Sequence, residues 1–200
     1  MKKIILIGAG GHCMSCVDVI ELQHKFKIVG LIDGRKGKFL LDYKIIGSDK
    51  KLKKLSKRIQ YALITVGHIK NSKIRENLFK KISNYGFKFP TIVSPLSYVS
   101  KRATIGEGTI VMHGSIINAE AKIGKNCIIN NKTLIEHDVV VEDNCHLSTR
   151  STVNGGVTIK KNSFIGSCSV IKQNIKIGKN CFVNANLFVE KNLKDNSKIL

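Results

Sequence analysis

The fold is decided by a stretch that begins at Ile123 and reads IGKNCI-INNKTL-IEHDVV-V as far as Val141. Every sixth residue in this stretch is aliphatic: Ile123, Ile129, Ile135 and Val141. Followed in both directions, the same register runs from Val99 to Val189 and meets sixteen positions, each occupied by Ile, Leu or Val. A hydrophobic repeat of this length predicts a repetitive architecture for the second half of the chain.

A strict period of six fits neither the turn of an α-helix, about 3.6 residues, nor a long alternating strand. Short strands joined by tight corners, coiling as a triangular prism, explain it. Each face then turns one large aliphatic residue inward and, four positions later, a small or branched one such as Cys127 or Thr133. Three faces per coil predict a parallel β-helix of about five coils. Because such repeats are stable only as a stack, a purely structural role would leave the same pattern.

The first half of the chain alternates strands with helices. Residues 2–7 form an apolar run that ends in a glycine-rich turn, and residues 13–23 are expected to form a helix. Further strands are expected at 27–32 and 61–66, and a second helix at 72–84. This alternation predicts a parallel sheet with helical crossovers, a Rossmann-like βαβ domain.

The boundary between the two halves is expected in the junction that contains Pro90 and Pro95. We therefore expect a nucleotide-sugar-binding domain over residues 1–93 and a β-helix domain over 94–200. The polar tail after Glu190 is expected to be loosely ordered.

Composition limits the classes of function. The net charge is +20, but the lysines are scattered and lack interleaved aromatic residues. This favours anionic small molecules, such as CoA and nucleotide sugars, over nucleic acid. The apolar run at the N-terminus is too short for a signal peptide or a membrane span, so a cytoplasmic protein without membrane insertion is expected. Its six cysteines should stay reduced, and Cys13 and Cys16 lack the second pair that a zinc site needs, so no metal is expected.

The turn after the first strand carries the beginning of a phosphate-binding fingerprint. Glycines there let the backbone approach a phosphate, and the N-terminus of the next helix supplies N–H donors. Gly8 and Gly10 fit the fingerprint, but Cys13 stands at its third glycine, so a turn that only packs the strand against the helix is the alternative. Asp33, at the end of the second strand, stands where such folds bind a ribose or a base edge.

Two histidines of the repeat are candidates for a general base, because imidazole exchanges protons near neutral pH. His137 and His146 avoid the inward positions, so their rings can project from the prism, although surface histidines would show the same pattern. His113 stands at a corner and is interpreted as structural. His24 lies in a lysine-rich stretch and is interpreted as solvated.

Together these motifs resemble those of the bacterial sugar O-/N-acyltransferases. The resemblance covers nearly the whole chain and rests on these segments: Gly8-Ala9-Gly10-Gly11-His12, Asp33, Ile64-Thr65-Val66-Gly67 with Arg75, and Ile135-Glu136-His137-Asp138 followed by His146 and Gly155. The family includes the N-acetyltransferases of UDP- and dTDP-linked 4-amino sugars, among them the bacillosamine pathway enzyme, and the sialic acid O-acetyltransferases. The resemblance implies a left-handed hexapeptide β-helix, acetyl-CoA as co-substrate, and a homotrimer with active sites between neighbouring prisms.

The resemblance also implies individual roles. His137 matches the general base, Asp138 the acidic residue that raises its basicity, and Gly155 a backbone N–H for the oxyanion. Asn130 matches a residue near the reacting acetyl and amine groups. The implied acetyl-CoA contacts are His146, Ser167 and Ala185. The implied contacts with the nucleotide sugar are Gly10, Gly11, His12, Asp33, Gly34 and Gly67.

Three departures from the family pattern bear on the substrates. Gly34 stands where the bacillosamine enzyme has a second aspartate, which affects uridine recognition. Residues 183–186 lack the usual glycines, and the sequence stops at Leu200 without the common Gly-x-Pro-Ala segment, which affects the adenine pocket.

The expected reaction is direct acetyl transfer to the C4 amine of a UDP- or dTDP-linked 4-amino-4,6-dideoxy sugar in bacterial surface-glycan biosynthesis. His137 accepts a proton as the amine attacks the thioester. Because neighbouring strand residues point to opposite sides, its contact with Asp138 requires a corner conformation, and Glu136 is the alternative orienting group. O-acetylation of a sialic acid is the alternative within the family. A non-catalytic trimeric scaffold that binds nucleotides is the alternative outside the enzymes.

Overall fold

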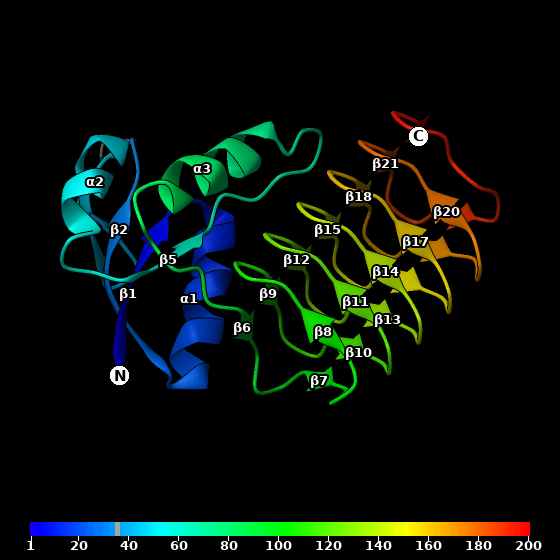
Figure 1. Cartoon of the computed structure of the whole chain (residues 1–200), viewed down its shortest axis with the longest axis horizontal. Helices are drawn as coiled ribbons and strands as arrows, with labels where there is room; N and C mark the ends of the chain where they lie inside the picture. Colours follow the sequence, from blue (N-terminus) through cyan, green and yellow to red (C-terminus); the bar gives the residue numbers. More distant parts are fainter. Residues whose placement is uncertain (35–36) are drawn as a thin grey trace.

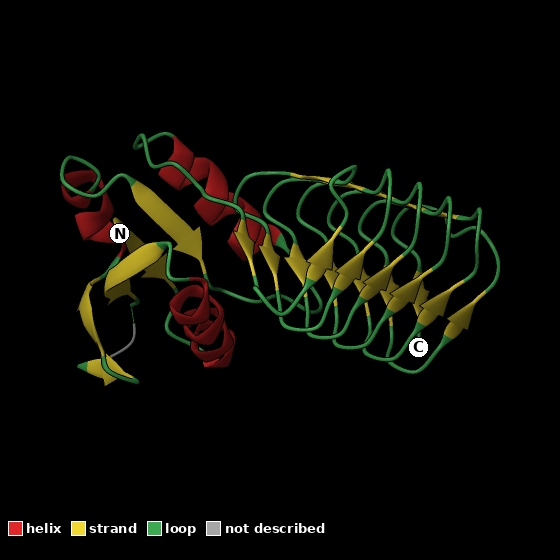
Figure 2. Cartoon of the chain, turned by 90° about the horizontal axis from the view of Figure 1, so that it is seen from below, coloured by secondary structure: helices red, strands yellow, loops and turns green. Residues whose placement is uncertain are grey.

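The computed structural model describes residues 1–34 and 37–200 and shows an α/β unit followed by a β-helix (Figure 1). The sheet of the α/β unit has the strand order β3-β4-β2-β1-β5. The β-helix is a left-handed stack of two-residue strands, seen as a row of coils in Figure 2. The expected fold class is confirmed.

The α/β unit contains the predicted strands and helices, with ends within two residues of those expected. Its elements are β1 (Lys2–Ile7), α1 (Gly11–Gln23), β2 (Phe26–Ile32), β3 (Phe39–Leu40), β4 (Tyr43–Gly47), the 3₁₀ helix η1 (Asp49–Lys51), α2 (Leu52–Leu55), β5 (Tyr61–Ile64) and α3 (Lys73–Ser83). The central strand β1 pairs in parallel with β2 on one side and β5 on the other. No pattern in the sequence indicated the β3–β4 hairpin or the η1–α2 segment.

Three parallel sheets form the faces of the prism. The first sheet holds β6 (Ile92–Val93), β9 (Ile110–Val111), β12 (Ile128–Ile129), β15 (His146–Leu147), β18 (Phe164–Ile165), β21 (Phe182–Val183) and β23 (Lys198–Ile199). The second holds β7 (Tyr98–Val99), β10 (Ile116–Ile117), β13 (Leu134–Ile135), β16 (Thr152–Val153), β19 (Val170–Ile171) and β22 (Phe188–Val189). The third holds β8 (Thr104–Ile105), β11 (Lys122–Ile123), β14 (Val140–Val141), β17 (Thr158–Ile159) and β20 (Lys176–Ile177). Ile117 pairs with Ile135, so one coil spans 18 residues (135 minus 117).

The interior of the prism follows the predicted register. Fourteen of the sixteen aliphatic positions are buried, and the other two, Val99 and Ile105, are half-buried at the open end of the stack. Buried hydroxyls at the small positions donate hydrogen bonds to carbonyls, as Ser163 does to Gly178 at 2.8 Å. The expected apolar core is confirmed.

The corners show a second period of six. From Gly108 to Asn186, every sixth residue has a positive φ. The left-handed backbone region favours Gly and Asn, which fill most of these positions. Asp138 is one of the exceptions, with φ 59°.

The tail after Glu190 was expected to be loosely ordered, and this expectation is wrong. Leu193 pairs with Ile177, and β23 pairs with β21. The pairing uses backbone groups, which any side chain permits, and polar side chains add to it, as the Asp195 carboxylate accepts a hydrogen bond from the Lys179 N–H at 2.8 Å. With β6 at the other end, the stack extends one strand beyond each end of the aliphatic register.

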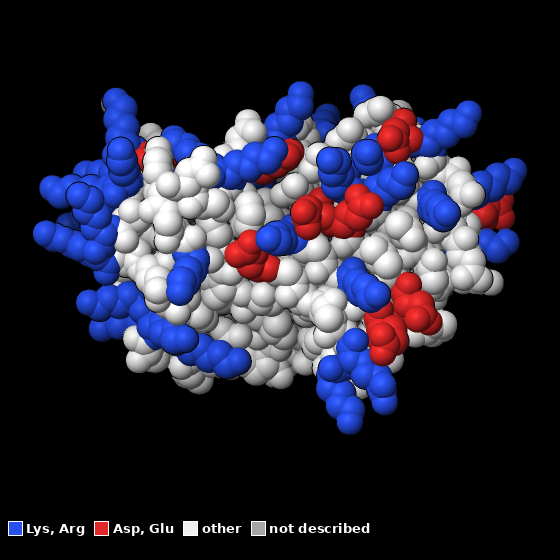
Figure 3. All heavy atoms as spheres, viewed as in Figure 1, with Lys and Arg blue, Asp and Glu red and all other residues white. Residues whose placement is uncertain are grey.

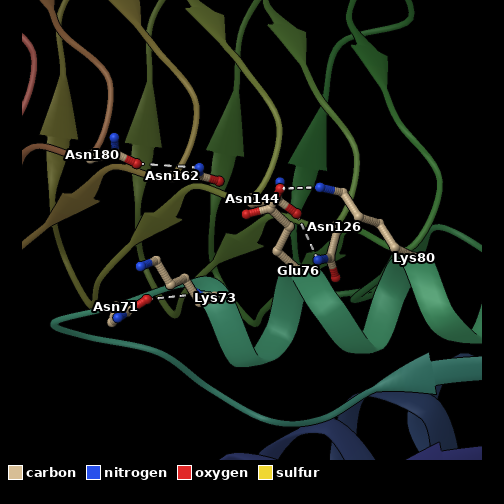
Figure 4. A network of polar contacts seen from close by, with 8 residues as sticks. All are labelled: Asn71, Lys73, Glu76, Lys80, Asn126, Asn144, Asn162 and Asn180. Carbon is tan, nitrogen blue, oxygen red and sulfur yellow. Dashed lines mark hydrogen bonds and ion pairs between the residues drawn. The ribbon is translucent and has the colours of Figure 1, made fainter.

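The three edges of the prism differ in their surroundings. We call the corners between the first and second sheets the pocket edge (residues 130–132, 148–150, 166–168 and 184–186), and those between the second and third sheets the histidine edge (136–138 and 154–156). The third edge, overlain by α3, carries a row of asparagines shown in Figure 4. In this row, Asn126 donates to Asn144 at 2.8 Å and Asn162 to Asn180 at 3.3 Å.

The α/β unit packs on the outer face of the first sheet, where Val17 and Ile20 of α1 share an apolar cluster with Ile110 and Ile128. Lysine and arginine side chains are dense around the end of the molecule that carries α2, whereas acidic and basic groups alternate along the β-helix (Figure 3). Among the described residues, no helix combines the length and the apolar composition needed to cross a bilayer.

Candidate active site

A cavity of about 300 Å³ opens where β1, β2 and β5 end; we call it the glycine cavity. It is lined by Gly8, Gly10, Gly11, His12, Asp33, Thr65, Val66 and Gly67. Gly8 has φ 103°, and a Cβ there would lie 2.5 Å from Val66 Cγ2, so the turn requires glycine. The Asp33 carboxylate accepts a hydrogen bond from the Ala9 N–H at 2.7 Å, which fixes the turn against the end of β2. Open α/β sheets bind ligands at this place, where strand order reverses.

A larger cavity of about 600 Å³, the interdomain cavity, lies between the α/β unit and the β-helix. It is lined by Gly11, His12, Ser15, Gly67, His68 and Ile69 on one side and by Asn130, Asn131, His146 and Thr149 on the other. Gly11, His12 and Gly67 line both cavities, so the two are neighbours. Gly34 follows Asp33 but is exposed and does not line either one.

His146 is buried in the wall of the interdomain cavity. Its side chain leaves the prism as predicted, but the loop after β5 covers it. The Nδ1–H donates to the His68 carbonyl at 2.6 Å, so Nε2 carries the lone pair, because a carbonyl can only accept. Asn130 Nδ2 lies 3.4 Å from that Nε2.

Three histidines around this cavity are held uncharged. Burial lowers the pKa of His12 and of His68 to about 3 and the pKa of His146 to about 4, and the Arg75 cation adds to each of these shifts. At neutral pH each ring therefore offers one donor and one acceptor. Within the described chain, no group of three or more His, Cys, Asp or Glu side chains is placed to hold a metal ion.

Arg75, on α3, holds the end of β5 against the β-helix. Its buried guanidinium donates to the carbonyls of Ile64 at 2.6 Å, Val66 at 3.0 Å and Asn126 at 3.0 Å. Burial lowers its pKa to about 10, which leaves it charged at neutral pH. The loop that closes the interdomain cavity is thus tied to both parts of the chain.

Ser167 and Ala185 lie further along the pocket edge. They repeat the corner position of Asn131 and Thr149 in later coils, so the four residues form a row that leads away from the interdomain cavity. The hydroxyl groups of Ser167 and Ser148 are hydrogen-bonded at 2.9 Å, and Ala185 is exposed. Of the three residues predicted to contact acetyl-CoA, Ser167 and Ala185 lie on this edge, and His146 lies on β15, the strand that leads into it.

His137 and Asp138 are exposed on the histidine edge. The positive φ of Asp138 supplies the corner conformation that lets adjacent side chains meet. The His137 Nδ1–H donates to Asp138 Oδ2 at 2.8 Å, which leaves Nε2 to accept a proton. Glu136 instead accepts a hydrogen bond from Asn118 at 2.8 Å, so the geometry favours Asp138 as the orienting carboxylate.

Gly155 lies one coil further along, directly against the His137 ring. A Cβ at this position would be 2.8 Å from His137 Nε2, so any side chain would obstruct the imidazole. No acceptor for the Gly155 N–H occurs among the described residues, which leaves this group to donate to a ligand.

Within one chain, the predicted catalytic residues fall into two groups. His137, Asp138 and Gly155 lie on the histidine edge, whereas Asn130 lies on the pocket edge beside His146. Strand β13 and the width of the second sheet separate the two edges. A site that uses both groups therefore needs edges from two chains.

Sequence reasoning missed His68, Asn131 and Thr149 as cavity residues. The 18-residue coil, counted back from Ser167 and Ala185, would have identified the last two. His68 carries no periodic signal because it belongs to a loop of the α/β unit. His113 is held by Ser94 Oγ at 2.7 Å and Asp18 Oδ2 at 2.9 Å, which supports its structural interpretation.

Two family descriptions match the chain. The PglD N-terminal domain matches residues 3–82, and the bacterial transferase hexapeptide (six repeats) matches residues 102–137 and 138–173. A curated relative, UDP-N-acetylbacillosamine N-acetyltransferase of Bacillus subtilis (strain 168), is 31% identical over 113 residues. That alignment covers 56% of this chain and about half of the relative, 52% of its length.

Solved structures resemble the chain over nearly its whole length. The acetyltransferase domain of PglB from Neisseria gonorrhoeae FA1090, in complex with acetyl coenzyme A, is 25% identical with a TM-score of 0.93 and covers 98% of this chain and 95% of its own. A mutant of perosamine N-acetyltransferase from Caulobacter crescentus, in complex with CoA and GDP-perosamine, is also 25% identical with a TM-score of 0.93 and covers 99% and 93%.

Proposed function

We propose that this chain, which belongs to the bacterial acyltransferases that join a PglD N-terminal domain to hexapeptide repeats, transfers an acetyl group from acetyl-CoA to the amine of a nucleotide-linked 4-amino sugar. The observation that carries the proposal is the pair of neighbouring cavities, one at the ligand-binding end of an α/β sheet and one against the β-helix. The named relatives, which are N-acetyltransferases of such sugars, support the same conclusion.

In this proposal the two domains hold different substrates. Residues 1–93 bind the nucleotide sugar, with Gly10, Gly11 and Asp33 at the nucleotide and His12 and Gly67 where the two cavities meet. Gly34, which lines neither cavity, is proposed to contact the nucleotide sugar through its backbone. The β-helix of residues 94–200 binds acetyl-CoA along the pocket edge, past His146, Ser167 and Ala185.

The proposed chemistry is direct transfer. The sugar amine attacks the thioester carbonyl carbon, His137 Nε2 accepts the proton that the nitrogen loses, and the bond to the CoA sulfur breaks as the tetrahedral intermediate collapses. The Gly155 N–H donates to the oxyanion, and Asp138 orients the imidazole and stabilises its protonated form. Asn130, beside His146, holds the acetyl group near the amine.

We also propose a homotrimer with active sites between neighbouring prisms. The outward side chains of the second sheet form a row that is apolar except for one threonine: Tyr98, Ile116, Leu134, Thr152, Val170 and Phe188. Tyr98 and Phe188 are 59% and 62% exposed, and an exposed apolar row of this kind suits a contact between copies of the chain. Packing through this sheet would bring the histidine edge of one chain against the pocket edge of the next.

We propose that the reaction takes place in the cytoplasm. No disulfide joins any of the six cysteines, each of which lies within the described residues, and five of them are buried. Cysteines that form no disulfide suit a reducing compartment.

An acceptor screen tests the proposed function. The protein is incubated with acetyl-CoA and, separately, GDP-perosamine, UDP- and dTDP-linked 4-amino sugars, and free and CMP-linked sialic acids, with thiol release and product mass as readouts. We expect thiol release and a singly acetylated product with a nucleotide-linked 4-amino sugar. Acetylation of the sialic acids alone, or of no acceptor, would contradict the proposal, and His137→Ala serves as the control for uncatalysed transfer.

A further inference from the structure

His68 stands on the loop after β5, in the wall of the interdomain cavity. Only 7% of it is exposed, and its ring lies edge-on to the ring of His146 with centroids 5.4 Å apart. The backbone carbonyl of His68 accepts a hydrogen bond from His146 Nδ1–H. The side chain has none of the polar contacts that hold the other buried histidines.

Both ring nitrogens of His68 are buried without a hydrogen-bond partner among the described residues. The other two histidines of this cavity are partnered: His146 donates to a backbone carbonyl, and His12 Nε2 lies 3.5 Å from Cys16 Sγ. Buried polar groups in proteins are almost always paired, and an unpaired one costs free energy. A side chain kept in this state is therefore a candidate for pairing with a ligand.

The state of the ring and the cavity around it indicate the chemistry of that ligand. Burial lowers the pKa of His68 to about 3, with the His146 and Arg75 charges as further causes, so the ring is neutral and offers one donor and one acceptor. No acidic or cationic side chain of the described residues lines the interdomain cavity. Hydroxyl and amide groups, which donate and accept together, fit such a wall.

The position of His68 identifies the part of the substrate that reaches it. The glycine cavity, with Asp33 and the N-terminus of α1, suits the nucleotide, and it joins the interdomain cavity through Gly11 and Gly67. On the opposite wall lie Asn130 and His146, next to which the acetyl group is proposed to sit. The group between them is the sugar ring.

We propose that His68 is a specificity-determining residue that hydrogen-bonds to a hydroxyl or amide substituent of the sugar ring. The proposal rests on the proposed function and adds a contact that distinguishes one sugar from another. A site built to pair with a polar group discriminates strongly against a sugar without it, because its own buried groups then stay unpaired.

The variant His68→Phe tests the proposal through two opposite effects. The phenyl ring fills the same space without polar atoms, so the melting temperature should stay equal or rise, since buried unpaired nitrogens are removed. The kcat/KM for the acetylated acceptor should fall roughly 10- to 100-fold, while the KM for acetyl-CoA stays within about twofold. His68→Gln, which keeps a donor and an acceptor, should recover part of the loss.

His113→Phe is the matched control. It removes a histidine whose nitrogens are both bonded, to Ser94 and Asp18, on the surface between α1 and the β-helix. Its melting temperature should fall and its acceptor KM should stay unchanged, the reverse of the His68→Phe result. Unchanged acceptor kinetics in His68→Phe would overturn the proposal and leave His68 a packing residue with an ordered water.

A binding measurement separates this proposal from the proposed function. The ring signals of His68 in an NMR spectrum, assigned by their loss in His68→Phe, are followed while GDP-perosamine or a UDP-linked 4-amino sugar is added, with GDP and UDP as references. Signals that move with a sugar nucleotide and not with the matching nucleotide support the His68 contact even if no acetyl transfer is found, which would count against the proposed function alone. The contact is overturned if the bare nucleotide shifts the signals as much as the sugar nucleotide does. It is also overturned if none of the added ligands shifts them.

Discussion

The histidine beside the pocket edge and the one on the histidine edge are in opposite environments. His146 is buried, bonded to a backbone carbonyl, and has a pKa lowered to about 4. The side chain of His137 is 66% exposed and bonded to a carboxylate. The scaffold is the same repeat at both places, so the difference comes from what covers each edge: the α/β unit closes over one and leaves the other open. We infer that the covered edge binds substrates and the open edge supplies the base.

A substitution that unfolds the β-helix, and so removes both edges at once, should have the largest effect on stability and activity. Ile135 is fully buried on β13, between the two edges. Ile135→Asp places an unpaired charge in the core at a cost on the order of several kcal/mol, so the β-helix should not fold. Circular dichroism and thermal melting measure the loss.

The neighbouring residue provides the control for this substitution. Leu134 precedes Ile135 on the same strand but points outward and is half-buried. Leu134→Asp should leave a folded chain, even where contacts between chains weaken. A soluble Ile135→Asp protein with a normal melting temperature would show that the register is wrong.

Removing the exposed imidazole should have the next largest effect. His137→Ala should lower kcat by roughly 10²- to 10⁴-fold, the usual range for general-base catalysis, with the KM for acetyl-CoA within a few-fold. Because the side chain is 66% exposed, the melting temperature should not change.

The equivalent substitution on the covered edge sharpens the contrast. His146→Ala should chiefly raise the KM for acetyl-CoA, because His146 is proposed to contact this substrate. Steady-state kinetics with both substrates varied distinguish the two patterns. Full activity of His137→Ala would show that His137 is not the general base.

The period-six repeat explains how much of this contrast could be predicted. The sequence placed Ile135 in the core, put His137 and His146 on the outside of the prism, and required a corner at Asp138, all of which the structure confirms. It could not show that His146 is covered, because the covering loop is held by Arg75, which donates to the carbonyls of Ile64 and Asn126, 11 and 51 residues away in the chain. The order of the tail after Glu190 could not be predicted for a related reason. Its strands pair through backbone groups, and this pairing does not require a particular pattern of side chains.

The covered edge should also make stability depend on pH. The pKa values of His12, His68 and His146 are about 3, 3 and 4 in the folded chain, below the ordinary value of 6.5, so the unfolded chain binds more protons between pH 6.5 and about 4. Stability is therefore full above pH 6.5 and falls as the pH drops through this window, by about 1.4 kcal/mol per unit for each histidine.

Denaturant unfolding at about pH 7, 6 and 5 measures how steeply the free energy of unfolding changes with pH. His146→Gln removes one of the three titrating groups and should reduce the slope by about 1.4 kcal/mol per pH unit. An unchanged slope would mean that His146 is charged, or freely hydrated, in the folded protein.

The central claim, that one active site takes the pocket edge of one chain and the histidine edge of another, is tested most directly by mixing two inactive variants. His137→Ala removes the base. Gly11→Trp fills the interdomain cavity, and it fits the fold because a Cβ at Gly11 meets nothing within 4 Å. The two chains are co-expressed with different tags, and the mixed oligomers are purified through both tags. If sites form between chains, one site in each mixed trimer combines an intact base with an open cavity, so activity should return to about a third of the unmodified level. Activity that stays at the level of the separate variants would show that both edges serve the same chain and would contradict the account.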